Sequence, residues 1–244
     1  MSGHSKWSNI KHKKEKTDTQ RAKIFTKTGR EIAVAVREGG TDPSANAHLK
    51  DIIAKARVNN VPNDNITRMI AKAAGSGEGD AYESITYEGY GPNGIAVIVE
   101  TMTDNRNRTA AEMRHYFDKY GGNLGATNCV SWQFERKGVL IVDAEGKDED
   151  EVMLDALDAG AADVQAEADV FEIYTEPDSF SLVRDALEAK GYAFLEAELE
   201  MIPSTYVTLT GEDDLKNMAK LLELLEENDD VQDVWHSWEN PTED

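Results

Sequence analysis

The pattern of apolar positions changes once along the chain, from a helical period to a strand period. Between residues 17 and 75 the apolar side chains recur at intervals of three and four, which is typical of amphipathic helices. After residue 80, short runs of β-branched and apolar residues alternate with helical segments. Gly75-Ser-Gly-Glu-Gly79 lies between the two regions and is typical of a flexible linker. The pattern therefore predicts a helical region followed by an α+β region.

Three helices are predicted in the first region. The first runs from Thr17 to Gly39-Gly40, because paired glycines end helices. The second opens at Asp42-Pro43-Ser44, and the third begins at Asn63 or Asp64. Short connections favour a small bundle over about residues 17–75.

The second region contains six elements in the order strand, helix, strand, strand, helix, strand, which is the ferredoxin-like order. They are expected at residues 137–142, 150–157, 163–167, 170–174, 179–189 and 192–200. The flanking segments give a second set of the same order when they are joined across this insert. That set comprises a strand at 94–102, a helix opened by a Thr109–Glu112 capping box, strands at 130–134 and 206–209, a helix at 213–227 and a strand at 231–238. Residues 84–90 alternate weakly, as a further strand would.

The predicted fold class is therefore α+β, with an N-terminal three-helix domain and two ferredoxin-like α+β domains, one inserted in the other. The expected boundaries are residues 1–80 for the basic arm and helical bundle, 81–136 plus 204–244 for the discontinuous domain, and 137–203 for the inserted domain.

Charge is distributed unevenly along this chain. The first thirty residues hold nine basic and two acidic side chains, a net charge of +7, whereas the whole chain carries −21 and the other 214 residues therefore −28. The nine basic residues are Lys6, Lys11, Lys13, Lys14, Lys16, Arg21, Lys23, Lys27 and Arg30. A basic leading end on an acidic body indicates a polyanionic partner.

Two segments are candidate nucleic-acid contacts. Residues 1–16 have no apolar periodicity and are expected to form an arm that becomes ordered on contact, whose lysines bind phosphate and whose Trp7 can stack on an exposed base. Arg106 and Arg108 are expected at a helix N-terminus, where backbone N–H groups already favour anions. The alternative for these two arginines is intramolecular pairing with the acidic body.

Catalytic chemistry finds no support in the sequence. The five histidines and the single cysteine, Cys129, include no pair at zinc-ligand spacing, and Cys129 is expected to be a buried thiol. No nucleophile elbow, Walker A loop or dinucleotide-binding fingerprint occurs. We therefore expect no enzyme activity, catalytic residue, metal or cofactor. The absence of a long apolar run and of a signal-peptide core predicts a cytoplasmic chain without a membrane partner.

Four segments closely resemble the YebC/PmpR family. They are MSGHSKWSNIKHKKEKTDTQRAKIFTK, VPNDNITRMIAKAAG, YEGYGPNGIAVIVETMTDNRNRT and GGNLG…VSWQFERKG. The resemblance implies three domains and a cytoplasmic DNA-binding transcriptional regulator. It also implies a second role, because mitochondrial relatives are translational activators and bacterial members are regarded as ribosome-associated factors that relieve stalls at proline-rich sequences. The arm residues from Lys6 to Lys27 and the pair Arg106 and Arg108 lie in matching motifs, whereas their assignment as contacts rests on charge and placement.

Three functions remain open from the sequence. A sequence-selective DNA regulator needs a helix that reads base edges, yet residues 63–74 offer only Arg68, Lys72 and a few asparagines. A factor bound to RNA or the ribosome suits a lysine arm with one tryptophan, and this hypothesis is favoured on physical grounds. A small-ligand sensor is the third, because ferredoxin-like units often bind metabolites, although a fold does not imply a function. Oligomeric state is not indicated.

Overall fold

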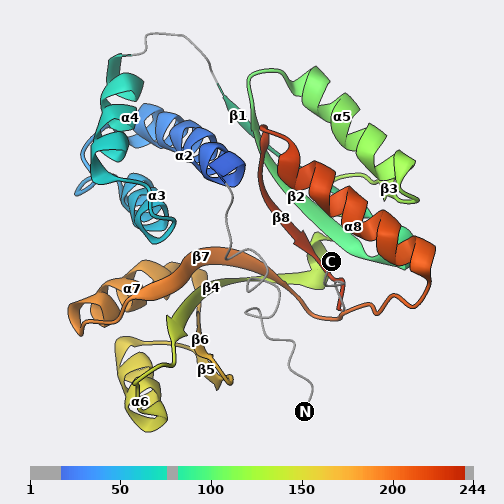
Figure 1. Ribbon diagram of the computed structural model, residues 1–244. Coiled ribbons are helices and arrows are strands. Elements are labelled where there is room, and N and C mark those ends of the chain that lie inside the picture. Colours follow the sequence, from blue (N-terminus) through green and yellow to red (C-terminus); the bar gives the residue numbers. More distant parts are fainter. Residues whose placement is uncertain (1–17, 76–81, 240–244) are drawn as a thin grey trace. The chain divides into compact units, whose positions relative to one another are not determined.

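The structure is a computed structural model and describes residues 18–75 and 82–239 (Figure 1). Contacts between Cα atoms divide the chain into two compact units, and each is described by itself. The first unit takes its described residues from Lys50–Ile66 and Arg136–Ile202. The second takes them from Thr17–Leu49, Thr67–Glu135 and Pro203–Asp244.

Three helices lie before residue 76 in the described chain, as predicted: α2 (Asp18–Gly39), α3 (Ala47–Val58) and α4 (Asn63–Gly75). Helix α2 ends where Gly40 enters the left-handed region at φ +84°, which favours glycine. Helix α3 begins later than expected, because Asn46 is its cap. The Asn46 side chain accepts from the Leu49 amide at 3.0 Å and donates to the Ala35 and Gly40 carbonyls at 2.8 and 2.9 Å.

The first unit contains a ferredoxin-like domain. Its elements are β4 (Phe134–Asp143), α6 (Glu149–Ala159), β5 (Asp163–Ala166), β6 (Val170–Thr175), α7 (Phe180–Ala189) and β7 (Phe194–Pro203). The sheet order is β5-β6-β4-β7, in which the first strand lies between the third and the fourth, as this fold requires. Leu140, Ile173, Val183 and Leu187 are fully buried and form part of its core.

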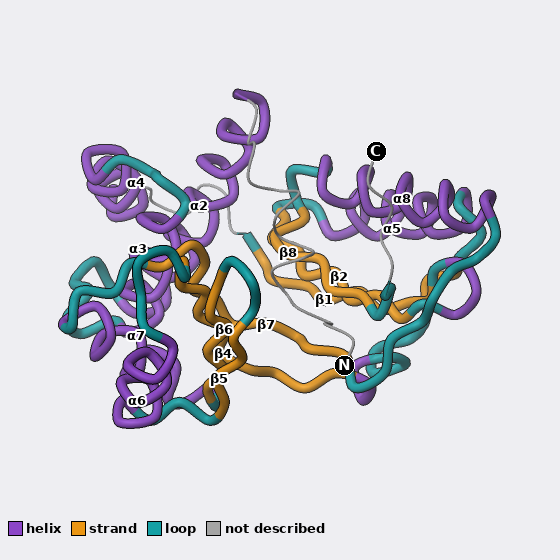
Figure 2. The backbone as a smooth tube through the Cα atoms, turned by 60° about the horizontal axis from the view of Figure 1, so that its bottom comes forward, coloured by secondary structure: helices purple, strands orange, loops and turns teal. Residues whose placement is uncertain are grey.

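The second unit is built on another four-stranded sheet. Its elements are β1 (Glu83–Tyr90), β2 (Ala96–Thr103), α5 (Arg106–Lys119), β3 (Asn123–Leu124), α8 (Glu212–Glu227) and β8 (Val231–His236). The order is β3-β1-β2-β8, with antiparallel neighbours. Helices α5 and α8 lie side by side on one face of this sheet (Figure 2), where Met113, Phe117, Leu221 and Leu225 are fully buried among the strand residues.

The predicted fold class is confirmed, although two expected strands of the outer set are wrong. Residues 206–209 contribute only an isolated bridge between Val207 and Trp238. The place beside β2 that the strand at 206–209 was expected to take is occupied by β1, which precedes β2 in the chain. Residues 130–134 contain a 3₁₀ turn, η2 (Ser131–Gln133), before β4 starts at Phe134. The expected domain boundaries stay a prediction. None of the described helices has the length and apolar character needed to cross a membrane.

The core under α5 provides a test of the second unit. Phe117 is fully buried, so its replacement by alanine should lower the free energy of unfolding by about 3–5 kcal/mol through lost burial and a cavity. Lys216→Ala on α8 of the same unit is the control, because this side chain is 74% exposed and its loss should change stability by less than about 0.5 kcal/mol. Urea unfolding followed by tryptophan fluorescence suits the measurement, since Trp132, Trp235 and Trp238 belong to the same unit as Phe117. Equal effects of the two changes would contradict the described core.

Candidate nucleic-acid interface

The predicted contact residues divide into those outside and those inside the described chain. The arm lies outside the described residues, and with it the predictions for Lys6, Trp7, Lys11, Lys13, Lys14 and Lys16. The remaining six lie on two helices of the second unit. Arg21, Lys23, Lys27 and Arg30 belong to α2, whereas Arg106 and Arg108 form the first turn of α5.

The four α2 cations differ in their surroundings. Arg21 is exposed and Lys23 is half-buried. The Lys27 ammonium donates to the Gln232 carbonyl of β8 at 3.3 Å. Arg30, one turn further along, also meets β8 at its N-terminal end, so this face of α2 is attached to the sheet by two cations.

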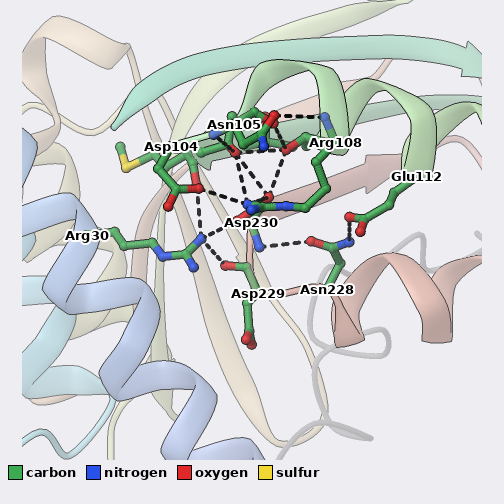
Figure 3. Close-up of polar contacts among 12 residues, drawn as sticks. Arg30, Asp104, Asn105, Arg108, Glu112, Asn228, Asp229 and Asp230 are labelled. Atoms are coloured by element: carbon green, nitrogen blue, oxygen red, sulfur yellow. Dashed lines mark hydrogen bonds and ion pairs between the residues drawn. The ribbon is translucent and has the colours of Figure 1, made fainter. Parts of the chain in front are cut away.

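Arg30 and Arg108 meet at one buried carboxylate, that of Asp230, in the turn between α8 and β8 (Figure 3). The Asp230 side chain is 4% exposed. Its Oδ1 accepts from Arg30 Nη1 at 2.7 Å, and its Oδ2 accepts from Arg108 Nη2 at 2.7 Å. The hydroxyls of Thr109 and Thr103 donate to Oδ2 at 2.7 and 3.1 Å. Asp230 thus joins α2, the end of β2 and the start of α5.

Arg30 also donates to two carbonyls. Its Nη1 lies 3.0 Å from the Met102 oxygen and 2.6 Å from the Asp229 oxygen, and its guanidinium lies 5.1 Å from the centre of the Tyr82 ring. The side chain is only 14% exposed. These contacts hold the Arg30 guanidinium in the interior of the unit, and its role as a nucleic-acid contact stays a prediction.

Arg108 pairs with Asp104 at 2.9 Å in addition to Asp230, and hydrogen bonds to both carboxylates raise its pKa. Arg108 thus makes the intramolecular pairs that were the alternative expectation. Its side chain is 43% exposed, and its role as a nucleic-acid contact stays a prediction. Arg106 is exposed at the N-terminus of the same helix.

The start of α5 differs from the predicted capping box. The helix begins at Arg106, and its cap is Asn105, whose side-chain oxygen accepts from the Arg108 amide at 3.1 Å. Thr109 is fully buried on Asp230, and Glu112 accepts from the Asn228 amide group at 2.8 Å. The Thr109–Glu112 capping box is therefore wrong, because Asp230 takes the hydroxyl that was expected to cap the helix.

Burial raises the pKa of the Asp230 carboxyl, but the hydrogen bonds from Arg108, Thr109, Arg30 and Thr103 oppose it and prevail. The pKa consequently lies below its ordinary value of 3.8. Asp230 is therefore ionised at neutral pH and forms ion pairs with both Arg30 and Arg108.

A second buried carboxylate, that of Glu88 on β1, organises the loop that follows β3. Glu88 is 4% exposed and accepts from the backbone amides of Asn128, Val130 and Ser131 at 2.8, 2.9 and 2.8 Å. Burial raises the pKa of Glu88, yet these three bonds outweigh burial and lower it. The same bonds explain the missing strand at 130–134, because amides that donate to Glu88 cannot join a strand ladder.

This loop presents Trp132, whose side chain is 75% exposed. The indole Nε1 donates to the Cys129 carbonyl at 3.0 Å. Cys129 itself is half-buried, and burial together with Glu88 raises the pKa of its thiol. Sequence reasoning missed Asp230, Glu88 and Trp132. Asp230 and Glu88 are two of 47 acidic residues, so their number gives no reason to single them out. Trp132 lies within an expected strand. The one available signal for Glu88 is a charged residue between the apolar positions of β1.

Comparison with known proteins decides the family. A model described as the TACO1/YebC protein N-terminal domain matches residues 5–76, and one described as the TACO1/YebC second and third domain matches residues 82–238. The chain belongs to the TACO1/YebC family. The resemblance seen in the sequence is thereby confirmed. Among the described residues of this family member, no group of three or more His, Cys, Asp or Glu side chains is arranged to hold a metal ion.

Relatives in the TACO1/YebC family are similar over their whole length. A protein of Acetivibrio thermocellus is 58% identical over 98% of this chain and 99% of its own, and one of Caldicellulosiruptor bescii is 57% identical over the full length of both. Both are named "Probable transcriptional regulatory protein". The crystal structure of a conserved hypothetical protein from Aquifex aeolicus is 46% identical, covers 98% of each chain and superposes with a TM-score of 0.85.

The Asp230 cluster can be tested with two neighbouring aspartates. Asp230→Asn should lower the free energy of unfolding at neutral pH by about 3 kcal/mol, because it leaves the mostly buried Arg30 without its ion pair. Asp229→Asn is the matched control, since this residue is exposed and contacts Arg30 through its backbone carbonyl. Urea unfolding of the three proteins measures the difference.

The pH dependence of this difference follows from the lowered pKa of Asp230. The stabilisation from the ionised Asp230 is fully present at pH values above 3.8, the pKa of this carboxyl in the unfolded chain. It is lost as the pH falls through the lower pKa that Asp230 has in the folded chain. The gap between wild type and Asp230→Asn should therefore narrow below pH 3.8. A gap that stays constant on acidification, or a control as unstable as Asp230→Asn, would contradict the ion-pair role.

Proposed function

We propose that this chain is a nucleic-acid-binding regulator of gene expression that acts without enzyme chemistry, in the cytoplasm. The observation that carries the proposal is the separation of charge along the chain, +7 over the first thirty residues and −28 over the rest, together with the attachment of α2 at Asp230. The names of the relatives support a transcriptional role and hence DNA as the target.

Electrostatics supports phosphate as the ligand of the leading segment. Lysine contacts to phosphate release condensed counterions, which makes binding favourable and dependent on salt. At physiological ionic strength exposed charges interact over about 8 Å, so a local cluster of cations binds despite a negative total charge. The acidic remainder repels the same polyanion. Most phosphate contacts should therefore be made by the leading segment.

Arg30 and Lys27 have an anchoring role in this proposal. Both hold α2 on β8, and the basic segment continues directly from the N-terminus of α2 in the sequence. Fixing α2 therefore fixes the point at which the basic segment joins the folded chain. Of the six predicted contact residues in the described chain, the exposed Arg21 and Arg106 are the proposed phosphate contacts. Arg108 is paired with Asp104 and Asp230, and Lys23 is a weaker candidate because it is half-buried.

RNA is the second candidate target, as part of a factor that acts on translation at the ribosome. One observation on α4 favours it. The described residues of this helix include two exposed cations, Arg68 and Lys72, and the exposed side chains beside them, such as Ala71 and Ala74, are small. Reading base edges in the major groove needs longer polar side chains in matched positions. Recognition by phosphate spacing and shape, as in structured RNA, makes no such demand.

Charge reversal in the basic segment tests the proposal. The double variant Lys13→Glu, Lys14→Glu should weaken binding to duplex DNA or structured RNA and lower the magnitude of the salt slope by about 2, because two phosphate contacts are lost. Fluorescence anisotropy with each labelled nucleic acid over a range of salt concentrations measures both quantities.

The matched control is Lys216→Glu, Lys220→Glu on α8, where both side chains are exposed and the change in net charge is the same. If the two double variants weaken binding equally, net charge rather than the basic segment governs affinity, and the proposal is wrong. A promoter duplex preferred over competitor DNA by about 10³-fold or more identifies a sequence-specific DNA regulator. Co-sedimentation with ribosomes that the Lys13, Lys14 reversal abolishes identifies the translational alternative.

A further inference from the structure

We infer that Trp132 is a stacking platform for an unpaired nucleobase, which makes the loop after β3 a second contact site for nucleic acid. The inference rests on the proposed function, because it names the part of the ligand that this loop recognises. It concerns a residue that the charge pattern does not reveal, at a loop that holds no lysine or arginine between residues 121 and 133.

The first observation is the exposure of an isolated aromatic ring. Trp132 keeps 75% of its surface accessible. The other large apolar side chains that are strongly exposed in the described chain are Leu154, Leu157 and Leu182, and all three belong to the first unit. Within the described residues of the second unit, Trp132 therefore stands alone as a large exposed apolar group. Exposing an indole costs free energy unless a ligand covers it.

The second observation is that the ring is held in place. Glu88 binds three amides of the loop, including that of Ser131 next to Trp132. The Cys129 carbonyl accepts from the indole Nε1 at 3.0 Å and from the Tyr90 hydroxyl at 3.3 Å. The Gln133 side chain in turn donates to that hydroxyl at 3.2 Å. An aromatic ring whose position is set before binding loses less conformational entropy when a ligand arrives.

Two glycines, Gly122 before β3 and Gly125 in the loop after it, support the same conclusion. A Cβ at Gly125 would overlap the Cys129 sulfur, and a Cβ at Gly122 would overlap the Tyr90 carbonyl oxygen. Only glycine lets the backbone at 125 come this close to Cys129, and the backbone at 122 come this close to β1. The GGNLG segment thus has a structural purpose, which is to bring the backbone close enough for Glu88 to bind it.

The chemistry of the ring selects the ligand class. Because the indole N–H already donates to Cys129, the remaining surface of Trp132 is its π-face, with no free donor to read a base edge. A π-face stacks on any base, but it reaches only bases that are not already stacked on both sides. The ligand is therefore an unpaired or splayed-out nucleotide, in DNA or in RNA.

A protein partner fits this surface less well. Protein interfaces bury an aromatic anchor within a contiguous apolar patch. The residues before Trp132 in the loop that are exposed are Gly125, Ala126, Thr127 and Asn128, which are small or polar. A single base that stacks on the ring needs no such patch, since its sugar and phosphate stay in water.

Binding of single-stranded oligothymidylate and oligouridylate, compared with a duplex of equal length, tests the inference. Trp132→Ala should weaken binding of the single strands by about tenfold, which lies within the stacking range measured for such platforms. Trp132→Phe should keep most of the affinity. The salt slope should stay that of wild type in both variants, because stacking neutralises no phosphate. Duplex binding should be unchanged.

A direct readout of stacking comes from an oligonucleotide that carries 2-aminopurine, whose fluorescence falls when it stacks. Wild type and Trp132→Phe should quench it on binding, whereas Trp132→Ala should not. Glu88→Gln tests the positioning role of Glu88, because an amide can accept through only one oxygen; it should reduce the quenching without altering the salt slope. Leu182→Ala, at another exposed apolar side chain, is the control for loss of apolar surface and should behave as wild type.

The outcomes separate this inference from the proposed function. If wild type binds single strands and Trp132→Ala binds them equally well with equal quenching, the stacking site is wrong and the proposed function stands. If Trp132→Ala weakens duplex and single strand alike, the ring does not select unpaired bases, and the inference is likewise wrong. If wild type binds no nucleic acid in any form, both the inference and the proposed function fail.

Discussion

The carboxylate of Asp230 is the point on which the arrangement of the second unit depends. It lies at the start of β8, is almost completely buried, and accepts from Arg30 on α2, Arg108 on α5 and Thr103 at the end of β2. A buried carboxylate without hydrogen-bond donors or cations would be protonated or hydrated, and a buried guanidinium without acceptors would be as costly. Both arginines therefore depend on the Asp230 charge, and α2 is held on the sheet by the bonds from Arg30 to Asp230 and to the Met102 and Asp229 carbonyls.

This interaction gives the charge separation a structural meaning. Residues 137–203 hold nineteen acidic and four basic residues, so the inserted domain is unsuited to phosphate. The cations are concentrated in the leading segment, which joins the fold at α2, the helix that Asp230 fixes. A polyanion is thus attracted to one end of the chain and repelled by most of the remainder. In its proposed stacking role, the exposed Trp132 adds an uncharged contact, which contributes affinity without contributing to salt dependence.

The sequence predicts this fold well where local rules decide. The ferredoxin-like order of residues 137–203 follows from period and turn residues, and the sheet order β5-β6-β4-β7 agrees with it. It fails where a distant side chain overrides local preference. Residues 130–134 include the strand formers Val, Trp and Phe, yet Glu88 binds the amides of Val130 and Ser131. Thr109 has the signature of a helix cap, yet Asp230 takes its hydroxyl. Likewise Arg30 and Arg108 are basic residues of the kind that contact phosphate, and only the fold reveals that one carboxylate holds both.

Removal of the first sixteen residues tests the central claim, that cations at the leading end contact phosphate while the acidic remainder does not. The measurement is the affinity of the truncated and the complete chain for the same nucleic acid across a series of salt concentrations. The segment removed carries five lysines and one glutamate, so the truncated chain should bind far more weakly at low salt and with a flatter salt dependence. Equal affinity of the two chains at every salt concentration would contradict the account.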